Sequence, residues 1–326
     1  MIVNVTQKTF SVLILFAISC VTAAQPSSAE QAGSYPNREV RIVVPFSPGS
    51  ITDVLARVLA DKLTTSWRQT VIVENRPGLP GTASVARSAA DGYTLMLTSN
   101  GHTIAALVNK DLTFDPAADF TGVAQVASVP HALIVPPDFP AKTVKDFIAL
   151  AKQNPGKFNF ASAGVASTSY LAAEYFTQTA NINLVHIPYK GAPEGILSVI
   201  RKESQLFVGG VNLVAQLHQT GKVFAMAVAT AKRNPLLPDV PTVAESGLPG
   251  FTYDAWFGLL APVNTPTQLV DKINHDVDDD LRMPDVQSKL AGQGIDPVIK
   301  TAPEFNQILK TDFDRYAKLW AAANSK

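Results

Sequence analysis

The clearest pattern of hydrophobic and polar positions lies between residues 41 and 63. Ile42 to Val44 is a short run of β-branched apolar residues, which is typical of a buried parallel strand. From Val54 to Leu63 apolar residues recur at helical spacing with charged residues between them, which predicts a helix with one buried face. Ser50 stands three residues before Asp53, the spacing of a capping box. The pattern therefore predicts a strand that leads directly into a helix start.

Such a joint can bind an anion. The first N–H groups of a helix lack partners within the helix, and the helix dipole places positive potential at that end. In an open α/β sheet, ligands bind in the crevice outside the carboxyl ends of the strands. An ordinary capped joint gives the same pattern, and every α/β domain contains several, so this joint alone does not decide between the two interpretations.

The alternation of strand and helix continues along the chain and then restarts. Strands are predicted at 69–74 and 93–97, each followed by small polar residues and a helix start. His131 to Val135 and the proline-rich segment after it predict a change of domain. Beyond them, a helix at 144–152 and strands at 157–161, 183–187, 206–208 and 223–228 repeat the pattern. It predicts α/β domains with mostly parallel sheets and helices on both faces.

The chain is predicted to return to the first domain near its end. A long proline-rich segment at 234–250 precedes Trp256 to Ala261, which predicts a strand that crosses back. Helices with capping boxes at Thr265 and Thr301 follow. We predict a discontinuous domain I at 35–127 and 255–326 and a domain II at 128–254, with hinges near Ser128 and Ala255.

The first 24 residues have the layout of a secretory signal peptide. Lys8 precedes an apolar run and a stretch of small residues, with a predicted cleavage site near Ala24. The single cysteine, Cys20, lies in this segment. A lipid anchor through Cys20 is the alternative, which Ala17 disfavours because a lipobox usually has a larger apolar residue there. We therefore predict a secreted protein without disulfides, held together by its hydrophobic cores.

Composition and motifs exclude several classes of function. The 27 basic residues balance the 27 acidic ones and form no cluster, so no nucleic-acid partner is predicted. G-x-S-x-G and G-x-x-x-x-G-K motifs are absent, and the five histidines lack metal-ligand spacing and are interpreted as surface or cap residues. The acidic run Asp276 to Asp280 lacks the glycine of a calcium loop and is interpreted as a solvated helix face. We predict no enzymatic activity, no cofactor and no metal; the remaining strand-end loops fit a cleft for a small anion.

Eight segments, in order, carry a resemblance to a known family. They are VRIVVPFSPGSITDVLAR, VIVENRPGLPGTASVA, DGYTLMLTSN, FNFASAGVASTSYLAAEYF, HIPYKGA, GKVFAMAVATAKR, LPDVPTVAESGLPGF and WFGLLAPVNTP. The chain resembles the periplasmic solute-binding proteins of tripartite tricarboxylate transporters, the Bug family. Each segment is weak by itself, but together they cover almost the whole mature chain.

The resemblance implies a two-domain periplasmic-binding-protein clam-shell, type II-like, which closes on an organic carboxylate. It also implies a monomer that hands its ligand to one large and one small membrane subunit. In this family, loop N–H groups, short hydroxyls and ordered waters hold the carboxylates. The implied contacts are Phe46, Ser50, Thr52, Thr82, Asn100, Ser162, Ala166, Ser167, Thr168, Tyr189, Lys190, Gly191, Ala192, Asn212, Asp254 and Trp256.

The chain departs from the family pattern at three places. Ser50 follows Gly49 where the first loop usually has two glycines, which adds a hydroxyl and puts the closest backbone approach in doubt. Tyr170 stands where a histidine often follows the second-domain loop. Residues 201–204 (RKES) replace a glycine-rich segment.

The charges near these positions indicate the kind of carboxylate. A pocket for an α-amino acid needs acceptors for the ammonium group, because an unpaired buried cation is costly. Residues 209–212 (GGVN) are neutral where some relatives carry an acid, which leaves Asp254 as the one acid near the inferred cleft. We therefore expect a di- or tricarboxylate. An aromatic acid stacked between Phe46, Tyr189 and Trp256 is the alternative, unless these rings belong to the core; a periplasmic ligand sensor and a secreted hydrolase are the other functions considered.

Overall fold

The computed structural model describes residues 35–165, 167–253 and 255–324. The predicted signal peptide with Cys20, and two of the predicted site residues, Ala166 and Asp254, lie outside these residues. None of the described helices is both long and apolar enough to cross a membrane. The helices and strands are, in order, β1 (Val40–Val44), α2 (Ile51–Trp67), β2 (Val71–Asn75), α3 (Leu79–Ala86), β3 (Thr94–Ser99), η1 (Asn100–Ile104), α4 (Ala105–Val108), β4 (Phe120–Val129), β5 (His131–Val135), α5 (Val144–Gln153), β6 (Asn159–Ser162), α6 (Thr168–Thr179), β7 (Val185–Pro188), α7 (Ala192–Ile200), β8 (Leu206–Gly210), α8 (Val211–Gln219), β9 (Phe224–Val228), β10 (Ala255–Pro262), α9 (Thr267–Arg282), α10 (Pro284–Ala291), β11 (Asp296–Pro297) and α11 (Ala302–Asn324).

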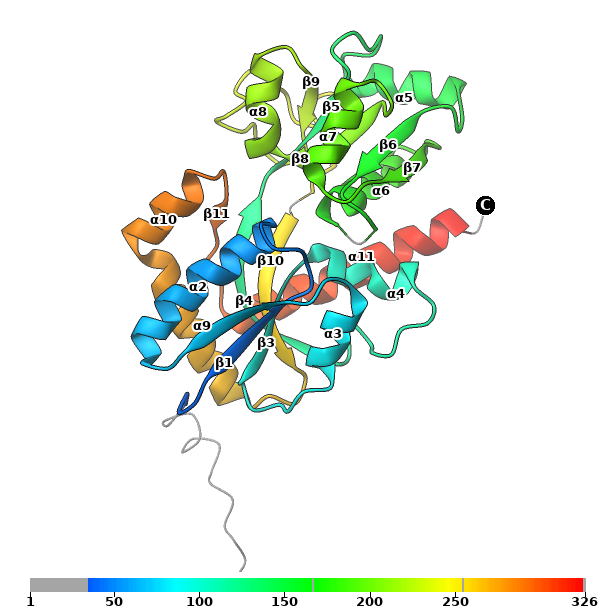
Figure 1. Cartoon of the computed structure of the whole chain (residues 1–326). Helices are drawn as coiled ribbons and strands as arrows, with labels where there is room; N and C mark the ends of the chain where they lie inside the picture. Colours follow the sequence, from blue (N-terminus) through cyan, green and yellow to red (C-terminus); the bar gives the residue numbers. More distant parts are fainter. Residues whose placement is uncertain (1–34, 166, 254, 325–326) are drawn as a thin grey trace, which may run out of the picture.

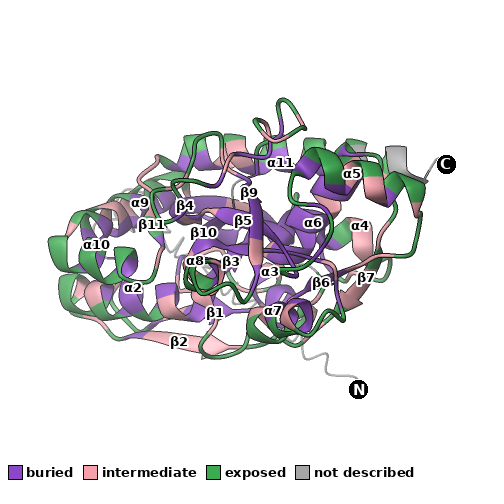
Figure 2. Cartoon of the chain, turned by 90° about the horizontal axis from the view of Figure 1, so that it is seen from above, coloured by how far each residue is buried: buried purple, intermediate pink, exposed green. Residues whose placement is uncertain are grey.

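The first domain is a six-stranded sheet in the order β11-β4-β10-β3-β1-β2 with helices on both faces (Figure 1). On one face, Leu55 of α2, Ile273 of α9 and Leu290 of α10 pack in a common core. On the other, Val85 of α3 and Phe305 of α11 do so. The central strands are buried between these layers and the edge strand β2 is half-buried, whereas the outer helices expose their polar faces (Figure 2).

The second domain repeats this architecture with five strands in the order β7-β6-β8-β5-β9. Phe147 of α5 and Phe176 of α6 pack on one face, and Val199 of α7 and Val214 of α8 on the other. The predicted two-domain α/β fold is thus confirmed. Each sheet is mixed, however: β1, β2 and β3 are parallel, as are β6, β7 and β8, but β10 and β5 run antiparallel to their neighbours. The strands β5 and β10 each follow a crossing between the domains. They therefore enter their sheet at the end where its parallel strands finish, and they run in the opposite direction.

The sequence analysis missed two features of the fold. The strand β4 has no visible alternation because it is covered on both faces, and it continues through Pro130 into β5 of the second sheet. The segment 209–212, predicted as a loop, instead ends β8 and begins α8. The chain therefore crosses between the sheets at 129–131 and is back in the first sheet at Ala255, where β10 begins.

The predicted capping boxes have mixed outcomes. The Thr301 box is confirmed, since the Thr301 N–H donates to the Glu304 carboxylate at 2.9 Å and the Glu304 N–H to the Thr301 hydroxyl at 3.4 Å. The Thr265 box is wrong. There α9 begins at Thr267 without a side-chain cap, and the Thr265 hydroxyl donates to the Pro262 carbonyl at 2.8 Å.

The acidic run on α9 is the solvated face that the sequence predicted only at Asp279, which is exposed, and not at Asp280, which is buried. Asp276 accepts hydrogen bonds from the Trp67 indole at 2.6 Å and from Lys272 at 2.8 Å. Asp280 is only 1% exposed, and its Oδ2 has no hydrogen-bond partner among the described residues. Burial, and then the nearby charge of Asp276, raise the pKa of Asp280 to about 6. This carboxylate faces the α2 side because α9 packs against α2.

Asp280→Asn is expected to stabilise the protein at pH 7.5. The folded-state pKa of Asp280 lies above its unfolded value, so the carboxylate costs no stability below about pH 4 and an increasing amount as the pH rises through 6. A shift of about two pKa units corresponds to roughly 2 to 3 kcal/mol, which the neutral amide should largely recover. Urea unfolding at pH 4 and pH 7.5 measures this. Asp279→Asn, at a side chain that is 62% exposed, is the control; an equal effect of Asp280→Asn at both pH values would contradict the explanation.

Candidate functional site

The predicted site residues lie mainly in loops at the facing ends of the two sheets. In the first domain the β1–α2 loop and η1 follow the carboxyl ends of two neighbouring parallel strands, β1 and β3. In the second domain, the loops at the carboxyl ends of β6 and β7 precede α6 and α7. These loop ends are directed toward the other domain (Figure 1). The arrangement agrees with ligand binding outside the carboxyl ends of parallel strands.

A buried carboxylate holds the first loop in place. The Ser50 hydroxyl accepts from the Asp53 N–H at 3.2 Å, as predicted. The Asp53 carboxylate, however, accepts from the Gly49 N–H at 2.9 Å, from Arg57 at 3.1 Å and from Asn75 at 2.9 Å. Burial raises the pKa of Asp53, but these hydrogen bonds outweigh it and hold the pKa below its usual value. The loop is thus fixed, and the Asp53 charge is already neutralised.

The other predicted residues of the first domain are more enclosed than the loop itself. The ring of Phe46 packs against the core shared by α2 and α9, and its carbonyl accepts from Asn75 at 3.2 Å. Thr52 and Thr82 are 3% and 7% exposed. Thr52 lies in the first turn of α2 and Thr82 in α3. Ser50 is half-buried, so its hydroxyl is more exposed than those of Thr52 and Thr82.

Hydroxyl groups fix the loop before α6. The Ser162 hydroxyl lies 2.7 Å from His186 Nε2 and accepts from the Gly164 N–H at 3.1 Å. Ser167 is the N-cap of α6: its hydroxyl accepts from the Tyr170 N–H at 3.2 Å and lies 3.0 Å from the Ser169 hydroxyl. Ser162 is fully buried. Its hydroxyl therefore shapes the loop, whereas Ser167 and Thr168 lie at its half-buried end.

The next loop lies beside the first. The Tyr189 N–H donates to the Ser162 carbonyl at 3.0 Å, which brings 162–168 and 189–192 together. The Lys190 N–H donates to the Glu194 carboxylate at 3.2 Å, and the Lys190 side chain is exposed. Gly191 is the N-cap of α7, and Ala192 begins the helix. Two helix starts, those of α6 and α7, therefore stand side by side in the second domain.

A tyrosine that the sequence analysis did not select joins the two domains. The Tyr253 hydroxyl accepts from Asn100 Nδ2 at 2.9 Å and donates to the Thr168 carbonyl at 2.7 Å. Asn100 follows β3 in the first domain and Thr168 begins α6 in the second. The His131 ring packs edge-on against Tyr253 at 5.5 Å, and its Nε2 lies 3.2 Å from the Thr168 hydroxyl. This network brings together predicted residues from both domains.

The surface interpretation of the histidines is wrong for His102 and His131. They are 6% and 2% exposed, and each has a ring nitrogen at hydrogen-bond distance from a backbone carbonyl. Burial lowers the pKa of both to about 4. The burial of His131 could have been expected from the sequence, because His131 stands directly after Pro130 at the predicted change of domain.

Two predicted residues make other contacts. The Trp256 indole is 2% exposed, packs edge-on against Phe305 at 5.3 Å and donates to Asp312 of α11 at 2.8 Å. Asn212 donates to the Gln293 carbonyl in the turn between α10 and β11 at 2.6 Å. Trp256 thus belongs to the core under α11, and Asn212 forms a contact between the domains.

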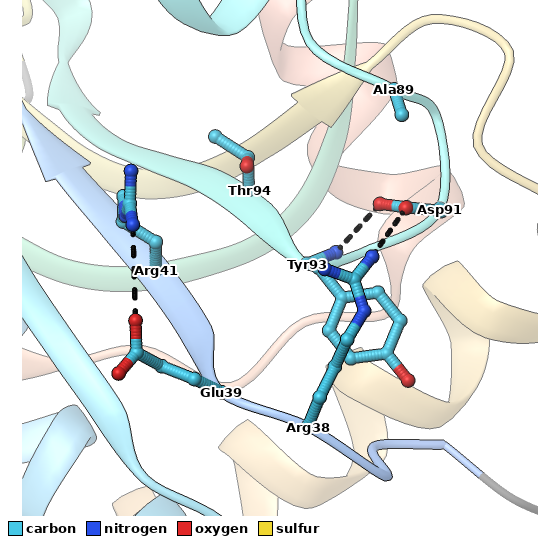
Figure 3. A pocket seen from close by; sticks show the side chains of 7 residues that line it. All are labelled: Arg38, Glu39, Arg41, Ala89, Asp91, Tyr93 and Thr94. Atoms are coloured by element: carbon cyan, nitrogen blue, oxygen red, sulfur yellow. Dashed lines mark hydrogen bonds and ion pairs between the residues drawn. The ribbon is translucent and has the colours of Figure 1, made fainter.

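Two cavities lie away from these loops. One of about 340 Å³ is at the opposite end of the first sheet, where Arg38 pairs with Asp91 at 2.9 Å and Arg41 lies near Glu39 (Figure 3). The other, of about 640 Å³, is lined by residues of β4, β11 and α11, by Trp256, and by Pro130 and Tyr253 at the two crossings between the domains. In the first sheet β11 and β1 lie on opposite sides of the crossing strands β4 and β10. The second cavity therefore lies on the β11 side of the crossing strands, and Tyr253 borders both this cavity and the contact between Asn100 and Thr168.

Comparison with known proteins places the chain in a family. The family model described as "Tripartite tricarboxylate transporter family receptor" matches residues 55–324. The chain belongs to this family. It is 32% identical over 312 residues to protein BugT of Bordetella pertussis, covering 94% of this chain and 95% of BugT. The resemblance inferred from the eight segments is thus confirmed.

Solved structures of similar proteins agree with this receptor family. Rpa4515 of R. palustris, solved with adipate, is 32% identical with a TM-score of 0.77, covering 89% of this chain and 98% of Rpa4515. MatC from Rhodopseudomonas palustris, solved with bound malate, is 30% identical with a TM-score of 0.76, covering 88% of this chain and 100% of MatC. The periplasmic binding protein BugD is 34% identical with a TM-score of 0.75, covering 89% of this chain and 99% of BugD. One of these similar proteins is thus a periplasmic binding protein, and the structures of the other two contain a dicarboxylate.

Proposed function

We propose that this receptor captures a di- or tricarboxylate between its two domains in the periplasm and delivers it to a membrane transporter with one large and one small subunit. The observation that carries the proposal is the Asn100–Tyr253–Thr168 network, which joins loops of both domains at the helix starts. Helix starts and short hydroxyls bind carboxylates through charge-assisted hydrogen bonds. The adipate and malate in two similar structures support this ligand class. The receptor acts as a monomer by binding rather than catalysis.

The charges of the described loops support a ligand without an amino group. Asp53 is engaged by Arg57, Gly49 and Asn75, and Glu194 accepts from the Lys190 N–H. Within the described loops, an ammonium group would have to break one of these arrangements or remain unpaired, which is costly in a closed cleft; Asp254, the one acid predicted near the cleft, lies outside the described residues. An aromatic acid has less support, because the Trp256 ring lies in the core under α11.

A thermal-shift panel is expected to show the largest stabilisation with a di- or tricarboxylate. At a hundred times Kd a ligand adds about 2.7 kcal/mol, hence a rise in Tm of several degrees at roughly 2 to 4 °C per kcal/mol. Succinate, malate, citrate and adipate are compared with aspartate, glutamate and benzoate. A larger shift with aspartate or glutamate would contradict the charge argument. A larger shift with benzoate would favour the aromatic alternative.

The role in transport needs a separate measurement. Cells that lack this receptor should take up the identified ligand more slowly, and the receptor gene should restore uptake. Unchanged uptake combined with a lost transcriptional response to the ligand would instead support a periplasmic sensor. Neither outcome changes the conclusion from the binding panel, which identifies the ligand.

A further inference from the structure

The cavity of about 640 Å³ beside the crossings, which we call the hinge-side cavity, has a floor made by β4 and β10. In this pair of strands Gln125 stands opposite Gly258, and Ser128 opposite Trp256. Residues directly opposite in an antiparallel pair point to the same face of the sheet. The Trp256 ring packs against Phe305 of α11, and a Cβ at Gly258 would lie 2.2 Å from the same ring. Gln125 and Ser128 are therefore directed toward α11, into the cavity that they line.

The floor contains an amide without a complete set of partners. Gln125 is 3% exposed, and its Oε1 has no hydrogen-bond partner among the described residues. Buried polar groups are hydrogen-bonded in the great majority of cases, so such an exception calls for an explanation. Rotation about the last side-chain bond lets a carboxamide present either its oxygen or its NH₂ group to an occupant. A molecule in the hinge-side cavity would supply the missing partner.

The charged groups around this floor favour an anion. The Lys300 side chain is half-buried, and its ammonium forms no ion pair with the described residues. The buried Asp312 carboxylate already accepts from the Trp256 indole at 2.8 Å and lies 3.9 Å from Arg315. Asp296, the other acid of the lining, is exposed to solvent. Lys300 thus offers a positive charge without a counter-ion inside the cavity.

Apolar groups form much of the remaining wall, namely Pro130, Ala231, Val298 and Ile308. A small inorganic anion would leave these groups uncovered, whereas an alkyl chain would remove them from water. The volume lies within the range of roughly 300 to 1,000 Å³ that is common for small-molecule sites. We propose that the hinge-side cavity is a second binding site, which takes a small amphipathic monoanion with one carboxylate on an apolar chain.

An occupant of this site contacts both domains. Thr230 and Ala231 follow β9 of the second sheet, whereas α11 packs on the first. Tyr253 lines the cavity and also joins Asn100 to Thr168. A molecule that fits this arrangement of the domains stabilises it, and with it the Asn100–Tyr253–Thr168 network. This coupling rests on the proposed function: the bound monoanion should tighten di- or tricarboxylate binding about fivefold or more.

Calorimetric titration with hexanoate tests the site, with hexanamide as its uncharged match. The native receptor should bind hexanoate about tenfold or more tightly than hexanamide. Lys300→Met keeps an unbranched side chain but removes the charge, so it should weaken hexanoate binding about tenfold or more and leave hexanamide unchanged. Lys310→Met is the matched control, because Lys310 is exposed on α11 outside the lining; it should bind hexanoate like the native receptor.

Gln125→Leu adds a measurement without any ligand. The apolar side chain has a similar size and removes the unpaired amide, so the free energy of unfolding in urea should equal or exceed that of the native receptor. Hexanoate affinity should nevertheless fall about tenfold. A purely structural role of Gln125 would instead lower the stability and leave hexanoate binding unchanged, which would contradict the site.

Three further outcomes would overturn parts of the proposal. Failure of hexanoate to bind, or equal binding by Lys300→Met, removes the site. Competition between hexanoate and the di- or tricarboxylate places hexanoate in the main cleft instead. Unchanged di- or tricarboxylate affinity at saturating hexanoate refutes the coupling alone. If the receptor binds no di- or tricarboxylate, the proposed function fails, but hexanoate binding that depends on Lys300 and Gln125 still establishes the second site.

Discussion

Gly294→Ala is expected to move the two domains apart and to weaken ligand binding about tenfold or more. Gly294 lies in the turn between α10 and β11 with φ of 64°, a left-handed conformation. A Cβ there would lie 2.2 Å from Asn212 Cβ, closer than carbon atoms can approach. Asn212 also donates to the neighbouring Gln293 carbonyl at 2.6 Å. The added methyl group would therefore overlap with Asn212 at the start of α8 in the other domain. To avoid this overlap the two domains must separate, which breaks the contact between Asn212 and the Gln293 carbonyl.

Gly221→Ala is the matched control for this change. Gly221 has φ of 69°, so its alanine variant carries the same backbone strain, but no atom lies within 4 Å of the added Cβ. Strain of this kind costs of order 1 to 3 kcal/mol and should lower both melting points similarly. Small-angle scattering should show a larger radius of gyration for Gly294→Ala alone. Equal dimensions and equal affinities in the two variants would show that the turn, not the domain arrangement, absorbs the clash.

The same contact bears on the proposed hinges. We propose that the domains rotate about the crossings near Ser128 and Ala255, with boundaries at 35–127 and 255–326 for domain I and 128–254 for domain II. Hinge closure uses a few residues at the ends of elements. The native receptor should therefore become more compact with its ligand, and Gly294→Ala should show a smaller change.

Local signals in the sequence predicted the helix starts and most strands well. Ser50 and Thr301 are caps because the stabilising atoms lie within three or four residues of each other. The strand β1 was recognisable because a buried strand in a parallel sheet reads as an apolar run, here Ile42 to Val44. The Thr265 box failed because its hydroxyl found the Pro262 carbonyl, an equally local alternative.

Contacts over long sequence distances were beyond such signals. Tyr253 joins Asn100 and Thr168, which are 153 and 85 residues away, and no spacing in the sequence relates these positions. Asp280 and Trp256 were misjudged for the same reason. Helical periodicity placed Asp280 in a charged run without showing that α2 covers it. The crossing position of Trp256 did not reveal that α11 lies over its ring.

Tyr253→Phe is expected to separate the two halves of the binding site while leaving the fold intact. The hydroxyl is lost from a side chain that is 1% exposed, and with it the bonds of 2.9 Å to Asn100 and 2.7 Å to the Thr168 carbonyl. Two buried hydrogen bonds contribute about 2 kcal/mol together, so the free energy of unfolding should fall by about that amount. Ligand affinity should fall by about tenfold or more, since ~1.4 kcal/mol corresponds to a factor of ten.

Tyr175→Phe provides the control for that change, because Tyr175 lies 6.5 Å from Tyr253 in the same group of rings and stacks on Phe251. Its hydroxyl has no hydrogen-bond partner among the described residues. We expect Tyr175→Phe to keep both stability and affinity. Denaturant unfolding and calorimetric titration, performed on both variants, separate the two effects. If Tyr253→Phe loses stability but binds its carboxylate as tightly as the native receptor, the Asn100–Tyr253–Thr168 network supports the fold and not the ligand.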